Sequence, residues 1–168
     1  MAIVELKGNQ TTTSGDLPPI GTQAPDFTAT KTDMTDLSLK DFAGKKVILN
    51  IFPSIDTGTC AASAREFNKQ LASLENTVVL CISKDLPFAH RRFCEVEGLK
   101  DVIPVSVFKN TSFPDAYPVT VTSGPLTGLL SRAVVVIDET GKIIYTEQVS
   151  EITKGPDYKK ALDSLKHE

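Results

Sequence analysis

Short, densely apolar runs alternate with amphipathic stretches from residue 26 to the end of the chain. Two of these runs, Lys46–Phe52 and Thr77–Ser83, have the pattern of buried strands, and a third apolar run, Ala133–Ile137, is predicted to be the first strand of a hairpin. Less regular strands are predicted at Asp26–Thr30, Val102–Val107 and Lys142–Thr146. Pro104, in the second of these, indicates an edge or interrupted strand, and Gly141 predicts a hairpin turn before the third.

The stretches between the strands carry helical periodicity. Phe67, Leu71 and Leu74 recur at spacings of four and three, which predicts a helix that begins just before Cys60 and ends near Asn76. Two shorter helical segments are predicted at Ser38–Phe42 and Asp157–Lys166.

A further helix is predicted from its terminal residues. Asp85 suits an N-cap, Pro87 suits the first turn, and Gly98 suits the C-terminal cap. We therefore expect a helix at Leu86–Glu97.

The remaining segments are less regular. Residues 1–20 predict a small hairpin with a Gly8–Asn9 turn, and residues 109–128 predict a long irregular connection. The order of strands and helices favours an α/β fold in which helices flank a mixed central sheet, and this order is compatible with a thioredoxin-like fold. We expect residues 1–168 to form a single domain of this kind, with the N-terminal β-hairpin as an extension.

Composition narrows the classes of partner. The formal net charge is -3 and no basic tract is present, which argues against nucleic acid and anionic membranes as partners. No run approaches the roughly 20 apolar residues of a membrane span. The N-terminal residues include Glu5 and lack a basic region before an apolar stretch, so no signal peptide is predicted and a cytoplasmic protein is expected.

The three cysteines do not indicate a structural disulfide framework, because their number is odd and a chain of 168 residues can form a sizeable core. Each is therefore a metal ligand, a buried apolar residue or a redox-active thiol. Cys81 lies within a predicted buried strand and is expected to be an inert core residue.

Cys60 is placed for nucleophilic chemistry. It follows a buried strand and the polar loop of Thr57, Gly58 and Thr59, and it lies at the start of a predicted helix. The positive end of a helix stabilises a thiolate, which is the nucleophilic form of cysteine. Loops beyond the carboxyl ends of strands are also the usual ligand-binding positions in α/β sheets.

Cys94 has weaker local signals. Considered alone, it is a half-buried helical residue without a chemical role, and it gains significance only as a second thiol within reach of Cys60. His90 lies four residues earlier, a spacing that can bind a metal, but His167 is the only other histidine. We therefore expect no metal site and no cofactor. Cys60 and Ser63 also match a C-x-x-S redox motif, which is weak because it fixes two residues only.

Longer segments resemble a known family. Pro53-Ser-Ile-Asp-Thr-Gly-Thr-Cys60 resembles the peroxiredoxin active-site motif P-x-x-x-[TS]-x-x-C, and Gly21-Thr-Gln-Ala-Pro-Asp-Phe27 is similar to the segment that opens this superfamily's domain. Four further segments are similar to the bacterial thiol peroxidase subfamily: Asn50–Ser63, Asp85–Ala89, Arg92–Cys94 and Ser131–Asp138. The resemblance covers nearly the whole chain and implies a thioredoxin-like fold with an added β-hairpin.

The resemblance implies a role for five residues. Cys60 matches the peroxidatic cysteine, Cys94 the resolving cysteine and Thr57 the active-site hydroxyl. Pro53 matches the shielding proline and Arg132 the active-site arginine. From its position alone, Arg132 would be interpreted as a surface charge or a salt-bridge partner.

The implied activity is thiol-dependent reduction of hydrogen peroxide and alkyl hydroperoxides to water and alcohols. The resemblance implies a sulfenic acid on Cys60, an intramolecular Cys60–Cys94 disulfide, thioredoxin as reductant and a homodimer. Two other functions use the same thiols: a redox sensor whose disulfide changes partner binding, and a general disulfide oxidoreductase.

Overall fold

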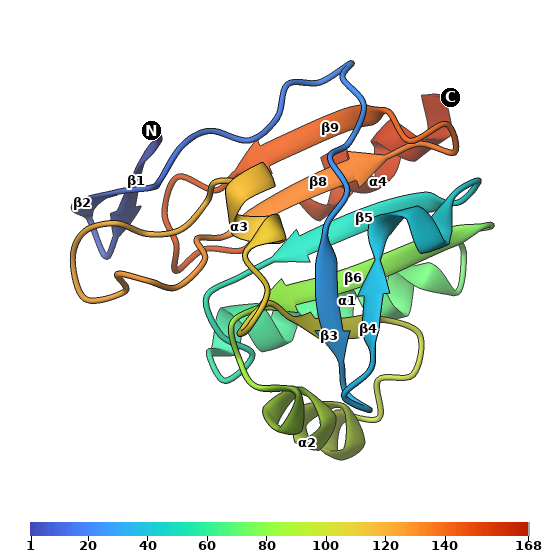
Figure 1. Ribbon diagram of the computed structural model, residues 1–168, viewed down its shortest axis with the longest axis horizontal. Coiled ribbons are helices and arrows are strands. Elements are labelled where there is room, and N and C mark those ends of the chain that lie inside the picture. Colours follow the sequence, from blue (N-terminus) through green and yellow to red (C-terminus); the bar gives the residue numbers. More distant parts are fainter. Residues whose placement is uncertain (168) are drawn as a thin grey trace.

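The computed structural model describes residues 1–167, and at its centre lies a mixed sheet (Figure 1). Within these residues the sheet has seven strands in the order β4-β3-β7-β6-β5-β8-β9. Their bounds are β3 (Thr28–Lys31), β4 (Asp36–Ser38), β5 (Lys46–Ile51), β6 (Thr77–Ser83), β7 (Ile103–Ser106), β8 (Ala133–Ile137) and β9 (Ile143–Gln148). β5, β6 and β7 run parallel, and the other pairs are antiparallel.

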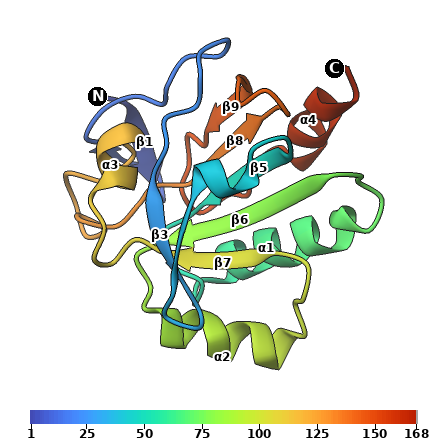
Figure 2. The ribbon, with the colours of Figure 1, turned by 45° about the vertical axis from the view of Figure 1, so that its right-hand side comes forward.

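Helices cover the sheet and its ends. They are α1 (Gly58–Leu71), α2 (Pro87–Glu97), α3 (Ser112–Ala116) and α4 (Tyr158–Asp163), with 3₁₀ segments η1 (Leu39–Phe42) and η2 (Ser164–His167). α1 packs against β6 and α2 against the neighbouring strand β7, and an ion pair of Arg65 with Glu97 at 3.3 Å links the two helices (Figure 2). The predicted fold class is confirmed. Among residues 1–167, no helix combines the length and the apolar character needed to cross a membrane.

The central strands are buried on both faces because nearly every residue in them is apolar. In β5, Val47, Leu49 and Ile51 join the apolar cluster on one face, whereas Ile48 belongs to the cluster on the other face. β8 alternates in the same way. The three dense apolar runs of the sequence are therefore the three central strands β6, β5 and β8, as the pattern predicts.

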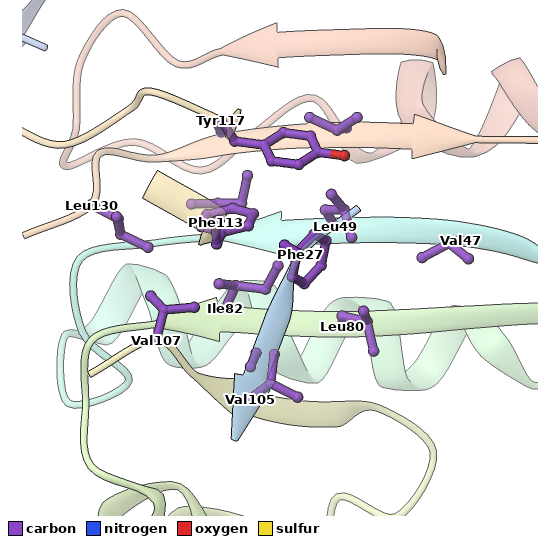
Figure 3. Close-up of a cluster of buried hydrophobic side chains, with 14 of the residues drawn as sticks. Phe27, Val47, Leu49, Leu80, Ile82, Val105, Val107, Phe113, Tyr117 and Leu130 are labelled. Atoms are coloured by element: carbon purple, nitrogen blue, oxygen red, sulfur yellow. The ribbon is translucent and has the colours of Figure 1, made fainter. Parts of the chain in front are cut away.

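Aromatic side chains cover the first face of the sheet. Phe113 of α3 stacks on Tyr117 with ring centroids 4.9 Å apart, and Phe27 meets Phe113 edge-on at 5.0 Å (Figure 3). The Tyr117 hydroxyl is buried but donates to the Pro25 carbonyl at 2.8 Å, so its burial leaves no unpaired donor. The irregular connection predicted at 109–128 thus contains the short helix α3, whose five residues give too little periodicity to detect.

The N-terminal hairpin lies at the end of the sheet where β5 and β6 finish (Figure 1). Its strands are β1 (Ile3–Leu6) and β2 (Asn9–Thr12), and Val4 packs with Val121 and Ile152. The turn lies at Lys7–Gly8, one residue earlier than predicted, because both residues have positive φ angles (51° and 82°) as a two-residue hairpin turn requires.

Several predicted boundaries were wrong. The first long helix, α1, ends at Leu71 and not near Asn76, where a positive φ of 51° is incompatible with a continuing helix. The last helix is α-helical only to Asp163 and continues as 3₁₀. β4 was not predicted, since three residues carry little alternation.

β7 is not an edge strand, although it contains Pro104. It pairs with β6 on one side and with β3 on the other. The ladder to β3 includes Val105 and Ser106 but not Pro104, so the proline lies where that ladder has ended.

Candidate active site

The loop between β5 and α1 carries the first candidate residues. Thr57 is the N-cap of α1: its Oγ1 accepts from the Cys60 N–H at 3.3 Å and donates to the Ser54 carbonyl at 3.2 Å. Pro53 is buried at the end of β5. Cys60 is the third residue after this cap, so the capping bond itself places the Thr57 hydroxyl beside the backbone of Cys60.

The Cys60 side chain is fully buried in the first turn of α1. It belongs to the apolar cluster that also contains Phe52, Ile55 and Phe67. The first turn of a helix has N–H groups without intrahelical partners, and the positive end of the helix dipole lies there. Cys60 thus combines an apolar surrounding with a local field that favours negative charge.

Arg132 lies beside Cys60 because of the strand register. It precedes β8, and the first residue of β8, Ala133, pairs with the last residue of β5, Ile51. The Arg132 side chain, 2% exposed, donates from Nη2 to Cys60 Sγ at 3.2 Å and from Nε to the Ile152 carbonyl at 2.8 Å. The interpretation of Arg132 as a surface charge is thus excluded.

Two hydrogen bonds orient the guanidinium group of Arg132, but not all of its N–H donors are used. Its two acceptors are a carbonyl oxygen and a sulfur atom, and neither is a carboxylate. Among residues 1–167, the buried Nη1 finds no hydrogen-bond partner. A buried cation needs a compensating charge and acceptors for its donors. A thiolate at position 60 would supply the charge, and an oxygen-rich ligand would supply the missing acceptor.

The hairpin contributes to this arrangement. The Ile152 N–H donates to the Glu5 carbonyl of β1 at 2.8 Å, while the Ile152 carbonyl accepts from Arg132. The N-terminal residues, which appear peripheral in the sequence, therefore support the segment that orients Arg132.

Two neighbours of Cys60 were not identified from the sequence. Tyr158 packs against the apolar cluster that contains Cys60, and burial raises the pKa of its phenol. Ser63 has a structural role: its Oγ donates to the Cys60 carbonyl at 2.8 Å and accepts from Asn50 Nδ2 at 3.1 Å. The sequence indicated Ser63 only through the C-x-x-S motif and gave no signal for Tyr158.

The three cysteines are free thiols with different environments. Burial raises the pKa of Cys81, a 1% exposed strand residue, to about 12, and the predicted core position is confirmed. Burial also raises the pKa of the half-buried Cys94. Cys94 lines a groove with residues that include Lys31 and Pro104, whereas Cys60 does not line it. The structure therefore brings Thr57, Cys60 and Arg132 together, places Pro53 as a buried residue of the same β5–α1 loop, and leaves Cys94 in a separate environment.

A second polar cluster joins the Cys60 loop to the start of α2. The Asp85 carboxylate accepts from Ser54 Oγ (2.7 Å), from the Ile55 N–H (2.7 Å) and from Ser83 Oγ (2.6 Å). His90 Nε2 lies 2.8 Å from Ser83 Oγ. The predicted N-cap role of Asp85 is wrong: Leu86 is the N-cap, without a side-chain bond, because the Asp85 carboxylate is directed to the neighbouring loop.

His90 is fully buried, and its ring is bonded within this cluster. Within the part of the chain that the structure describes, no group of three or more His, Cys, Asp or Glu side chains could hold a metal ion.

The predicted C-cap of α2 is confirmed, since Gly98 adopts a left-handed conformation with φ of 67°.

The Asp85 cluster predicts an acid-sensitive contribution to stability. Burial alone would raise the pKa of Asp85, but His90 and the hydrogen-bond donors lower it from 3.8 to about 2. Because the folded-state pKa is the lower one, the carboxylate stabilises the fold above about pH 4 by about 2 kcal/mol, and this is lost as the pH falls toward 2. We expect the urea unfolding midpoints of wild type and Asp85→Asn to differ at neutral pH and to converge in acid. A difference that is independent of pH would contradict this account.

Comparison with known proteins agrees with this geometry. The model of the Redoxin family matches residues 19–162. The thiol peroxidase of Corynebacterium glutamicum is 52% identical over 165 residues, which cover 98% of this chain and 99% of that protein. The thiol peroxidase of Mycobacterium tuberculosis is 49% identical with the same coverage.

Solved structures agree as well. A peroxiredoxin-like protein from Aquifex aeolicus has a TM-score of 0.92 and 33% identity, with 98% of this chain and 96% of that chain covered. The thiol peroxidase from Chromobacterium violaceum is similar in fold, with a TM-score of 0.90, 22% identity and coverage of 98% and 95%. The family match extends over most of the chain, and the full-length relatives are about half identical to it. The chain therefore belongs to the Redoxin family, as a peroxiredoxin-type oxidoreductase of the bacterial thiol peroxidase group that reduces peroxides with a thiol.

Proposed function

We propose that this chain reduces hydrogen peroxide and alkyl hydroperoxides through Cys60, resolves the oxidised cysteine with Cys94 and is recycled by thioredoxin. The observation that carries the proposal is the hydrogen bond from the buried Arg132 guanidinium to Cys60 Sγ at 3.2 Å. A charged donor on sulfur favours the thiolate, and the thiolate is the nucleophile.

In the first step the Cys60 thiolate attacks the terminal oxygen of the hydroperoxide. A sulfur–oxygen bond forms, the oxygen–oxygen bond breaks, and the departing alkoxide or hydroxide takes a proton to leave as alcohol or water. Cys60 is thereby oxidised to a sulfenic acid. Arg132 Nη1, which is buried and has no partner, supplies a donor for the negative charge that develops on the peroxide oxygens.

Thr57 and Pro53 complete the proposed site. The Thr57 hydroxyl accepts a hydrogen bond from the Cys60 N–H and lies beside the helical turn that carries Cys60. In this position it can orient the peroxide. Pro53 has no N–H and is buried, so it forms an apolar wall that limits access of water to the reacting sulfur.

In the second step Cys94 attacks the Cys60 sulfur. A disulfide forms, and the sulfenic oxygen leaves as water with the thiol proton. A dithiol of thioredoxin then reduces the disulfide by exchange and is itself oxidised. The reducing environment that maintains such a cycle is that of the cytoplasm, where we place the protein.

We also propose a homodimer. Leu86 and Phe88 at the start of α2 are 50% and 66% exposed, and large apolar residues at such positions commonly mark a protein interface. Sedimentation of the wild-type protein and of Phe88→Glu tests this proposal. A wild-type monomer would contradict it.

Replacing Cys94 is expected to leave the oxidation of Cys60 by peroxide intact and to abolish the formation of the disulfide. Cys94→Ser retains the Cys60 environment, so we expect one equivalent of hydroperoxide to be consumed in a burst, with no sustained turnover in an assay coupled to thioredoxin and its reductase. Cys81→Ser is the control and should sustain turnover. Undiminished turnover by Cys94→Ser would contradict the resolving role.

The same assays separate the two other functions. A redox sensor would show one stoichiometric oxidation by wild type without sustained turnover. A general disulfide oxidoreductase would reduce insulin in the absence of peroxide.

A further inference from the structure

The Cys60 and Cys94 segments are joined by the Asp85 cluster, defined as Ser54, Ile55, Ser83, Asp85 and His90. β5 and β6 are parallel neighbours, so the loops that follow them leave the same edge of the sheet. Asp85 lies in the loop after β6 and binds two donors of the loop after β5, five and six residues before Cys60. On its other side the cluster includes His90, one helical turn before Cys94.

The direction of the hydrogen bonds follows from the available protons. Ser83 has a single hydroxyl proton, which it donates to the Asp85 carboxylate at 2.6 Å. The Ser83 oxygen therefore accepts from His90 Nε2 at 2.8 Å. His90 on α2, Ser83 at the end of β6 and Asp85 thus form a chain that ends on the loop before Cys60.

Burial strengthens the hydrogen bonds of the Asp85 cluster, which connect the loop before Cys60 to α2. The side chains of Asp85 and His90 are 12% and 0% exposed. Hydrogen bonds to a carboxylate that is shielded from water are stronger than neutral or exposed ones, and a donor left unpaired there is costly. A second contact between the same segments is an ion pair of Asp56 with Arg92 at 3.1 Å, but both side chains are more than 60% exposed, and such pairs contribute little.

The cluster is intact in a conformation that does not favour disulfide formation. Cys60 is enclosed by its apolar cluster and bonded to Arg132, while Cys94 lines a groove on another helix. A disulfide requires the two Cα atoms to lie within about 7 Å and the attacking thiol to ionise. Burial raises the pKa of Cys94, which disfavours its ionisation here. This conformation therefore holds the two thiols in different environments.

We propose that Asp85 is a positioning residue that holds the loop before Cys60 against the start of α2, in the conformation that reacts with peroxide, and that this contact must break before the Cys60–Cys94 disulfide forms. This inference rests on the proposed function, because that function supplies the sulfenic acid on Cys60. In the coupled step Cys94 attacks the Cys60 sulfur, the sulfur–oxygen bond breaks, and water leaves.

The proposal predicts opposite effects on the two chemical steps. In Asp85→Asn the amide keeps the shape of the carboxylate but loses its charge and presents N–H groups toward donors. We expect the rate of Cys60 oxidation by hydrogen peroxide to fall by about tenfold, the effect of one lost charge-assisted hydrogen bond, and the rate of disulfide formation to rise by a similar factor. A larger share of sulfenic acid should then be resolved before a second peroxide converts it to sulfinic acid.

The experiment is rapid mixing with peroxide followed by acid quench and mass spectrometry of the full chain, which counts thiol, sulfenic, sulfinic and disulfide forms over time. Ser54→Ala removes one loop donor without altering α2 and should change both rates in the same directions, but less. The ion pair of Asp56 with Arg92 bridges the same segments at the surface. Asp56→Asn removes this pair and should change either rate by less than about twofold.

The outcomes are distinct. A slower first step with a faster second step in both Asp85→Asn and Ser54→Ala supports the proposal. Equal slowing of both steps would show a merely structural role, unchanged rates would show no role, and equal effects of Asp56→Asn would show that any lost charge suffices; each overturns the proposal. Absence of the Cys60–Cys94 disulfide in wild type would instead overturn the proposed function, and this inference with it.

Discussion

Replacing Cys60 by serine is expected to lower kcat/KM for hydroperoxides by at least about a thousandfold. A hydroxyl group is not ionised at neutral pH, and its oxygen is a poor nucleophile toward a peroxide bond, so the first step has no substitute in the fully buried pocket. The substitution is small and Arg132 can still donate to an oxygen. We therefore expect the circular dichroism spectrum to remain that of wild type.

The measurement is peroxide consumption at several substrate concentrations, with Cys81→Ser as the matched control. Cys81 is equally buried but lies on β6, outside the site, and its replacement should leave kcat/KM within a few-fold of wild type. Retention of a tenth or more of the activity by Cys60→Ser would contradict its role as the nucleophile.

Replacing Arg132 by methionine is expected to lower kcat/KM by about a hundredfold to a thousandfold, the usual effect of removing a donor that stabilises developing negative charge. The same substitution should slow alkylation of Cys60 by iodoacetamide, because the thiolate loses its charged partner. Stability should change little, since methionine fills much of the volume and removes a buried charge.

Arg132→Lys provides the control for charge. Lysine keeps the charge, but its single nitrogen cannot bond both the Ile152 carbonyl and Cys60 Sγ in the positions that Nε and Nη2 occupy. We expect an intermediate loss of activity. Wild-type activity in Arg132→Met with unchanged Cys60 alkylation would contradict the account of the site.

The sheet was predictable because its signal is local. β5, β6 and β8 are so apolar that burial on both faces is the only stable arrangement, and the bounds of β6 agree with the prediction residue for residue. Gly98 is a local signal too, since the left-handed C-cap depends on the residue itself. β4 and α3, of three and five residues, are too short to show a period.

Asp85 shows why part of the site was not predictable. An aspartate just before a helix satisfies the local rule for an N-cap, yet Ser54 and Ile55 of another loop donate to the same carboxylate, and these two donors lie close only after β5 and β6 pair. Arg132 is a similar case when its position is considered alone, although the family resemblance implied its role. Burial of an arginine is rare, and only the register of β8 with β5 brings it to Cys60.

The central claim, that Cys60 reacts with peroxide and is resolved by Cys94, is tested most directly by peptide mass spectrometry. Wild-type protein is treated with one equivalent of hydroperoxide, and its free thiols are then alkylated. We predict a Cys60–Cys94 crosslink and an alkylated Cys81. Sulfenic or sulfinic acid that persists on Cys60 beside an alkylated Cys94 would contradict the role of Cys94, and an unmodified Cys60 would contradict the account as a whole.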